Sequence, residues 1–214
     1  MERKTFPIGS LVLFALFLLV MLATWLLIRP PTPPAELAGV LRPHYRLLAP
    51  FELTDQHDQV FNQQRLQGKW SMLFFGYLSC PDVCPMTLHE LNRFWRLVED
   101  EAGTPPKDLQ IVFVSVDPAR DSPQELGAYV RHFNPGFIGA TARSDQVDLL
   151  AHQFGAGYVL EEETAPGQYL VAHTSAIFLV DPLGRSVAIF SQPHYANTLH
   201  HQYGRIRQYF SAAG

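Results

Sequence analysis

Residues 70–85, WSMLFFGYLSCPDVCP, place a strongly apolar run directly before two cysteines, each of which is followed by proline. A short apolar run of this kind is typical of a buried strand, and the amphipathic pattern over about 86–101 is typical of a helix. Pro85 suits the first turn of that helix, where its missing N–H group would have had no partner. The segment predicts a buried strand, a loop that carries Cys80 and Cys84, and a helix that begins close to Cys84.

Apolar runs and helical patterns alternate on both sides of this segment. Upstream, FELTDQHDQVFN (51–62) predicts two short strands around a polar turn. Strands that alternate with helices before a late hairpin are typical of an α/β domain, in which a mixed central sheet has helices on both faces. The downstream elements predicted are a strand in LQIVFVSVD (109–117), a helix over 123–133, a strand in FIGAT (137–141), a helix over 145–154, a hairpin of AIFLVD (176–181) and SVAIFS (186–191), and a helix over 197–210.

An uncharged apolar run near the N-terminus, IGSLVLFALFLLVMLATWLLI (8–28), predicts one transmembrane helix. At a rise of about 1.5 Å per residue, a helix of this length matches a hydrocarbon core of about 30 Å. Arg3 and Lys4 precede the run, so the positive-inside rule mildly favours a cytoplasmic N-terminus. A cleaved signal peptide is the alternative, because Ala23 is small, but the run is longer than the usual signal core of about 7–15 residues. We therefore predict an uncleaved anchor in residues 1–29.

Proline dominates the segment that follows the anchor, since four of the five residues 30–34 are prolines. Prolines enforce a stiff, extended backbone, and we predict a linker over residues 30–44. Residues 45–214 are predicted to form a single domain, because 214 residues with 47% hydrophobic content can bury one core of ordinary size. We expect the chain in the cell inner membrane as a single-pass protein, with this domain in the periplasm or an equivalent extracytoplasmic space.

The charge balance excludes one class of partner. The formal net charge is -4, and no basic run occurs beyond Arg3-Lys4. A protein that binds nucleic acid needs a positively charged patch for the phosphates, so nucleic acid is not expected as a partner.

Cys80 and Cys84 are the two cysteines of the chain, which is too few for a disulfide scaffold. Amide groups at the start of a helix carry partial positive charge and lower the pKa of a nearby thiol, an effect expected at Cys84. The thiolate form attacks disulfides and also binds metals, so a redox-active pair and a metal site both stay open. The simpler alternatives are a structural disulfide or two inert core thiols, which an exposed loop with two prolines disfavours.

A third metal ligand has to come from elsewhere in the chain. Among the nine histidines, His173 stands out, because GQYLVAHTSAIFLVD (167–181) places it at the entrance to a core strand. In thioredoxin-like folds, this loop lies beside the cysteine loop. The other histidines are expected to be solvated or capping residues: His44, His57, His89, His132, His152, His194, His200 and His201.

Copper is the metal that best suits this ligand set. Two thiolates and one imidazole favour Cu(I), and the nitrogen helps the set to accept Cu(II) as well. Structural zinc would need a fourth protein ligand. Asp82 or Asp117 could serve, although each is better explained as the end of a turn or of a strand.

Three ordered runs resemble the Sco/SenC family of copper-delivery proteins: FFGYLSCPDVCPMTL (74–88), VFVSVDPARDSPQEL (112–126) and YLVAHTSAIFLVDPLGR (169–185). The similarity covers about residues 45–211. It implies a thioredoxin-like fold that holds copper through Cys80, Cys84 and His173.

Further expectations follow from the same resemblance. Asp117 matches the acidic residue of the family's VDP motif near the site. The chain departs from the family at Ala172 and Thr174, where Asp and Ser are common, so the surroundings of the imidazole are expected to be built differently here. Family members are thought to deliver copper, or thiol reducing equivalents, to the dinuclear copper site of cytochrome c oxidase subunit II.

The sequence therefore predicts a membrane-anchored copper chaperone that serves cytochrome c oxidase subunit II or another copper-accepting protein. The main alternative is a thiol–disulfide oxidoreductase that uses Cys80 and Cys84 to reduce the cysteines of the acceptor and does not need His173. A peroxidase that uses one low-pKa cysteine is a third possibility. Enzymatic activity belongs only to the second and third of these functions.

Overall fold

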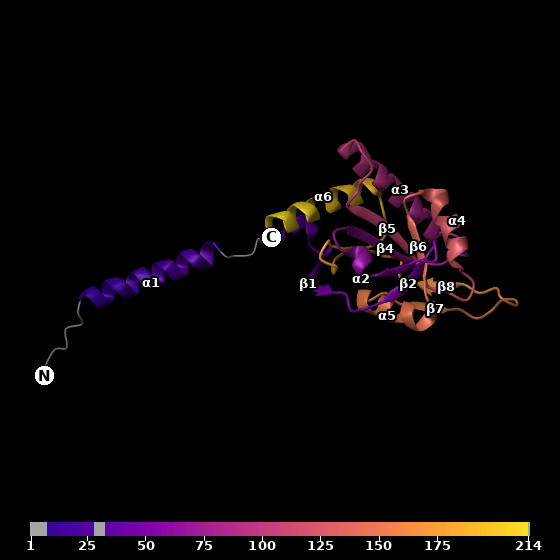
Figure 1. Cartoon of the computed structure of the whole chain (residues 1–214), viewed down its shortest axis with the longest axis horizontal. Coiled ribbons are helices and arrows are strands. Elements are labelled where there is room, and N and C mark those ends of the chain that lie inside the picture. Colours follow the sequence, from indigo (N-terminus) through magenta and orange to yellow (C-terminus); the bar gives the residue numbers. More distant parts are fainter. Residues whose placement is uncertain (1–7, 28–32, 214) are drawn as a thin grey trace.

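The structure of the chain is a computed structural model that describes residues 8–27 and 33–213. Figure 1 shows the strands packed with the helices that follow them in the chain, and the helix α1 (Ile8–Leu27) is drawn apart from them. In the described ranges, no helix combines the length and the apolar character needed to cross a membrane. The transmembrane anchor predicted for residues 1–29 is not shown by the structure. Parts of the predicted anchor and linker, residues 1–7 and 28–32, lie outside the described residues.

An eight-stranded mixed sheet forms the centre of the domain, with the strand order β1-β10-β9-β4-β5-β6-β2-β3. Strand β5 is parallel to both β4 and β6, and the other neighbouring pairs are antiparallel. The bounds of these strands are β1 (Leu41–Leu47), β2 (Glu52–Asp55), β3 (Val60–Asn62), β4 (Trp70–Gly76), β5 (Leu109–Ser115), β6 (Ile138–Thr141), β9 (Ile177–Val180) and β10 (Arg185–Phe190).

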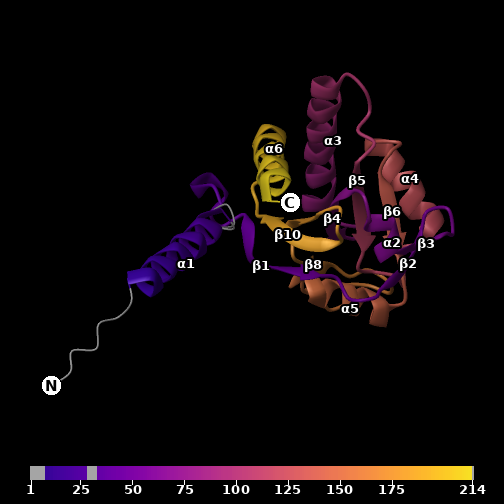
Figure 2. The ribbon, with the colours of Figure 1, turned by 60° about the vertical axis from the view of Figure 1, so that its left-hand side comes forward.

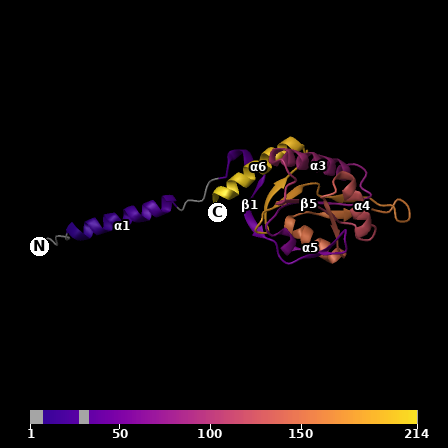
Figure 3. The ribbon, with the colours of Figure 1, turned by 45° about the horizontal axis from the view of Figure 1, so that its top comes forward.

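Helices cover both faces of this sheet, which confirms the predicted α/β class. Figures 2 and 3 show α3 and α6 over one face and α5 over the opposite face. The bounds of the helices are α2 (Gln63–Leu66), α3 (Val83–Ala102), α4 (Pro123–Phe133), α5 (Ser144–Phe154) and α6 (Ala196–Ala213), with a short 3-10 helix η1 (Ala35–Leu37) before β1.

The central strand β4 fixes the start of the cysteine loop. All residues of β4 and of its parallel neighbour β5 are buried, as expected for strands with helices on both faces. Successive side chains of β4 face opposite sides of the sheet. The Phe74 ring contacts Phe113 at 6.0 Å between centroids, and the Phe75 ring contacts Phe154 of α5 at 5.8 Å. Packing on both faces therefore holds Gly76, the last residue of β4, in a fixed place.

Most predicted elements lie where the sequence pattern places them. The helix predicted over 123–133 has those bounds, and the Ser122 side chain caps it in a reciprocal arrangement with Glu125. Helix α3 begins at Val83, three residues before the predicted start at Met86. Cys84 therefore lies inside the first helical turn.

Three strands were not predicted. Strand β1 begins at Leu41, inside the segment 30–44 predicted as linker, and pairs with the edge of β10. Strands β7 (Tyr158–Leu160) and β8 (Val171–His173) form a separate two-stranded sheet. Each of these two strands has only three residues, too few to show a periodic pattern. His173 is therefore the last residue of a short strand and lies four residues before the core strand β9.

Candidate metal centre

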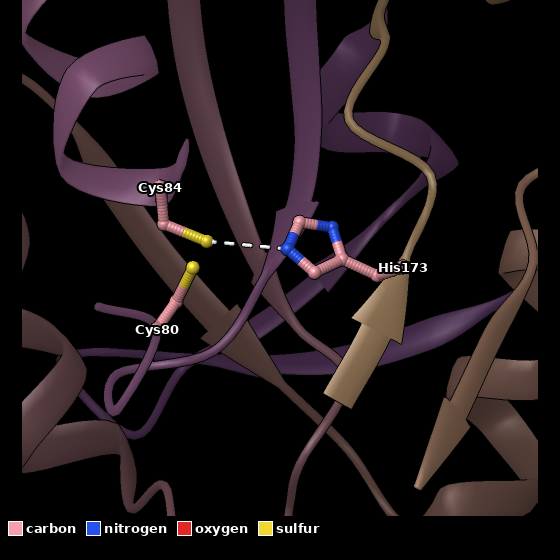
Figure 4. A group of neighbouring side chains, drawn as sticks. All are labelled: Cys80, Cys84 and His173. Atoms are coloured by element: carbon pink, nitrogen blue, oxygen red, sulfur yellow. Dashed lines mark hydrogen bonds between the residues drawn. The ribbon is translucent and has the colours of Figure 1, made fainter. Parts of the chain in front are cut away.

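Two consecutive segments and a third that is distant in the sequence meet at the end of β4. Cys80 lies on the loop after β4, Cys84 lies in the first turn of α3, and His173 ends β8. One ligand atom from each of the three residues lies within 4.8 Å of the others. Figure 4 shows the three side chains pointing toward one another. Over residues 8–27 and 33–213, no other group of three or more His, Cys, Asp or Glu side chains meets this criterion. The structure thus brings together the three residues predicted from the sequence.

The last residue of β4 allows Cys84 to approach the sheet. A Cβ atom built on Gly76 would lie 2.7 Å from the Cys84 Sγ and 2.7 Å from a ring carbon of Phe113. Both distances are shorter than real Cβ contacts, so the position accepts only glycine without a shift of its neighbours. Cys84 is fully buried against this glycine, whereas Cys80 is 9% exposed at the rim of the site.

The His173 ring is oriented by the backbone. Its Nδ1 lies 3.2 Å from the Thr174 carbonyl oxygen. A carbonyl can only accept, so Nδ1 donates to it, and Nε2 is the ring nitrogen that faces the sulfurs. Nε2 lies 3.4 Å from the Cys84 Sγ. Ala172, where the family often has Asp, is exposed and has no polar side chain to offer the imidazole. The Thr174 carbonyl oxygen is the hydrogen-bond partner of Nδ1 instead.

Of the two neighbouring thiols, only one is readily ionised. A hydrogen bond from the Cys84 thiol, with further help from His173, lowers the pKa of Cys80 to about 4. The hydrogen bond to Cys80 and complete burial raise the pKa of Cys84. The expectation that the helix start would favour thiolate at Cys84 is wrong, because burial and the neighbouring thiolate outweigh the helix amides. The metal-free site therefore holds a Cys80 thiolate beside a Cys84 thiol.

This asymmetry predicts how alkylation of the metal-free protein depends on pH. Because the pKa of Cys80 is lowered, its thiolate persists as the pH falls and is lost only near pH 4. The alkylation rate with iodoacetamide should stay nearly constant from pH 8 to 5, where an ordinary thiol with a pKa of about 8.5 loses about tenfold per pH unit. A Cys80→Ser chain should react slowly throughout, and a rate that falls with pH like that of an ordinary thiol would contradict the assignment.

Neither candidate for a fourth ligand joins the group. Asp82 is exposed and its side chain makes no capping bond at the start of α3. Asp117 is buried, but its carboxylate accepts hydrogen bonds from the Arg120 Nε at 2.5 Å and the Tyr169 hydroxyl at 2.8 Å. The donor set of two sulfurs and one nitrogen therefore stands without a carboxylate, and it fits copper better than structural zinc.

Two residues that support the site were missed by the sequence analysis. Asp121 is buried and accepts from the Ser115 hydroxyl at 2.6 Å and the Leu78 amide at 3.0 Å, which holds the loop before Cys80. Burial raises the pKa of Asp121. Its neighbour in the DPARD run, Asp117, drew attention through the family motif, but no local pattern marks Asp121.

His194 is the second missed residue. It was expected to be solvated or capping, yet it is buried, and its Nε2 donates to the Ser175 carbonyl at 2.8 Å. This bond ties the start of α6 to the segment that follows His173, and burial lowers the pKa of His194. His200 is partly buried beside Glu101. The remaining histidines are exposed as expected: His44, His57, His89, His132, His152 and His201.

Comparison with known proteins identifies the family. The SCO1/SenC family profile matches residues 40–208. The "Putative copper-binding protein" of Stutzerimonas stutzeri is 40% identical over 145 residues, which cover 68% of this chain and 69% of the relative. The structure of Arabidopsis thaliana ScoI with copper bound is 31% identical, with a TM-score of 0.70, over 76% of this chain and 99% of the other. Yeast Sco1 with copper bound is 31% identical, with a TM-score of 0.69, over 76% and 88%.

These matches confirm the predicted thioredoxin-like fold, since both Sco structures superpose on about three quarters of the chain with TM-scores close to 0.7. The family profile covers the whole sheet, the cysteine loop and His173. Because it spans well over half of the sequence, the chain belongs to the SCO1/SenC family.

Proposed function

We propose that this chain is a membrane-anchored copper chaperone that binds copper through Cys80, Cys84 and His173. The observation that carries the proposal is the meeting of two sulfurs and one imidazole nitrogen within 4.8 Å. Two thiolates and one imidazole form a soft, three-coordinate set that suits Cu(I) and can accept Cu(II). The copper-bound Sco structures and the relative's name support copper as the metal. The acceptor that family membership favours is the dinuclear copper site of cytochrome c oxidase subunit II.

The protonation of the site suits the uptake of copper. Cys80 is the more exposed sulfur and is already a thiolate, so it offers the first bond to an arriving ion. Cys84 has to release its proton to become a ligand, and metal binding therefore releases protons from the site. The His173 Nε2, which lies 3.4 Å from the Cys84 Sγ, completes the set.

The location of the domain is part of the proposal. The run 8–28 has no charged residue. Together with Arg3 and Lys4 before it, the run supports an inner-membrane anchor with the domain in the periplasm. Digestion of the domain by a protease confined to the cytoplasmic side would contradict this placement.

Replacement of His173 by alanine tests the ligand set. The purified full-length chain should bind about one copper, with a sulfur-to-copper charge-transfer band for Cu(II). His173→Ala should weaken Cu(II) binding by about a hundredfold, or about 3 kcal/mol, because it removes the ligand that best suits Cu(II). Cu(I) should be less affected, because both thiolates remain. Titration against a competing chelator measures both affinities.

His89→Ala is the matched control, because His89 is exposed on α3 and outside the group. It should leave the band and both affinities unchanged. Full Cu(II) binding by His173→Ala would overturn the assignment of the third ligand.

A thiol–disulfide oxidoreductase is the second candidate function. It is favoured by one observation, the pairing of a rim thiolate, Cys80, with a buried thiol, Cys84, which matches the division of roles between attacking and resolving cysteines. This function needs the cysteines but not His173. An oxidase-assembly assay separates the two: equal loss of assembly with His173→Ala and Cys84→Ala supports copper delivery, and loss with Cys84→Ala alone supports thiol reduction.

A further inference from the structure

The strand that carries His173 does not belong to the main sheet. Strands β7 and β8 pair only with each other among the strands of residues 33–213, and the loop between them extends away from the body in Figure 1. Most residues of this β7–β8 hairpin (158–173) are exposed. Both cysteines, in contrast, belong to the packed body of the domain. The distance between His173 and the cysteines therefore depends on the side-chain contacts that hold the hairpin in place.

Arg120 makes several of these contacts. Its guanidinium lies 3.5 Å from the centroid of the Tyr169 ring, within the range of close cation–π stacking. Its Nη1 donates to the carbonyl oxygens of Tyr169 at 3.0 Å and Gly167 at 3.3 Å. One side chain from the loop after β5 thus grips both the backbone and a ring of the hairpin, four residues before His173.

Arg120 is itself fixed by the buried Asp117. Its Nε forms an ion pair with the buried Asp117 carboxylate at 2.5 Å. The other oxygen of Asp117 accepts from the Tyr169 hydroxyl at 2.8 Å. A planar guanidinium can pair and stack at once, which a lysine cannot do. Arg120, Asp117 and Tyr169 therefore form a closed set that joins the hairpin to the body.

A second route leads from the same guanidinium to the imidazole. Arg120 lies 5.8 Å from the centroid of the Tyr77 ring, and the edge-to-face contact of Tyr77 with His173 is 5.9 Å between centroids. The Tyr77 hydroxyl is hydrogen-bonded to the backbone of Val171 in β8. Tyr77, which lies near Arg120, thus contacts both the strand β8 and the imidazole ring of His173.

We propose that Arg120 is a positioning residue that clamps the β7–β8 hairpin and so holds His173 Nε2 over Cys80 and Cys84. This inference rests on the proposed function, because it concerns the third ligand of the same copper site. Release of the clamp lets His173 move away while both sulfurs stay in place. Arg120 therefore decides whether the ion has three protein ligands or two, and it affects Cu(II) more than Cu(I), since Cu(II) depends more on the nitrogen.

The test is Arg120→Ala in the full-length chain. Cu(II) affinity should fall by about tenfold to a hundredfold, the range seen when residues that orient metal ligands are replaced. The nitrogen coupling in the Cu(II) paramagnetic resonance spectrum should weaken toward that of His173→Ala, and Cu(I) affinity should change little. In the metal-free chain, amide hydrogen exchange should accelerate over residues 158–173 while β4 and β5 stay protected.

Two variants show whether the effect belongs to the clamp. Arg185→Ala is the matched control, because Arg185 also pairs with a buried aspartate, Asp181, and lies over aromatic rings, but at the β9–β10 turn. It should lower stability and leave the copper spectrum unchanged. Arg120→Lys keeps the charge but loses the planar stack, so it should resemble Arg120→Ala.

Two results would overturn the clamp. One is an Arg120→Ala chain with unchanged Cu(II) affinity and unchanged exchange over 158–173, and the other is an equal loss of Cu(II) with Arg185→Ala. Failure of the proposed ligand set has a different signature, in which His173→Ala itself leaves the Cu(II) spectrum unaltered. In that case the exchange rates of the metal-free hairpin alone support or overturn the clamp.

Discussion

Replacing Cys84 by alanine is expected to abolish stable copper binding while the fold persists. Structural zinc sites in small peptides are worth about 10–16 kcal/mol, and on that scale one of three ligands carries about 3–5 kcal/mol, or roughly a thousandfold in affinity. Cys84 is fully buried, and its Sγ lies 3.4 Å from the His173 Nε2. Its loss leaves Cys80 and His173, two ligands that cannot enclose the ion. Copper content after dialysis against a competing chelator measures the effect.

Thermal unfolding of the metal-free chains is the control for this variant. Removing one buried sulfur atom from a packed site should cost only about 1 kcal/mol, close to one buried methylene group. The folded Cys84→Ala chain should therefore lose copper far more than it loses stability. A variant that keeps a full equivalent of copper against the chelator would contradict the proposed centre.

Replacing Gly76 by alanine is expected to damage both the core and the metal centre. The added Cβ would lie 2.7 Å from the Cys84 Sγ and 2.7 Å from a Phe113 ring carbon. Phe113 is fully buried and packs against Phe74, so it has no room to yield. Overpacking of this kind costs about 3 kcal/mol, which corresponds to a fall in Tm of about 6–12 °C for a domain of this size. Displacement of Cys84 should lower copper affinity as well.

Gly204→Ala in α6 is the matched control for this substitution. Gly204 is exposed, and a Cβ there would meet no atom within 4 Å. Alanine in a helix is favoured over glycine by about 0.5–1 kcal/mol, so this variant should be slightly more stable than the native chain. If Gly76→Ala and Gly204→Ala unfold at the same temperature and bind copper equally, the close approach at Gly76 affects neither stability nor copper affinity.

The parts of the fold that were predicted from sequence are those with long, periodic or strongly capped patterns. The helix over 123–133 has a capping box that marks its start, and the apolar run of β4 is long enough to stand out. Strand β1 could not be found, because LRPHYRL has no alternating pattern and becomes a strand only by pairing with β10. Edge pairing is a tertiary effect that local patterns do not encode.

The candidate site was predictable in its members but not in its electrostatics. Two nearby cysteines and one histidine before a core strand could be found from spacing and from the family motifs. The division into a Cys80 thiolate and a Cys84 thiol depends on burial, which becomes visible only in the packed structure. The supporting bonds of Asp121 and His194 have the same origin, because each joins segments that are distant in the sequence.

The three ligands differ in how firmly the protein holds them, and this difference sets an order of exchange. Cys84 is buried in the first turn of α3, Cys80 lies at the rim, and His173 lies on a hairpin outside the main sheet. Under the proposed function, an acceptor approaching the rim can replace His173 first, then Cys80, and Cys84 last. Such a transfer is associative, because each new bond to the ion forms before an old one breaks. The ion then passes between the two proteins without ever becoming an aqueous ion.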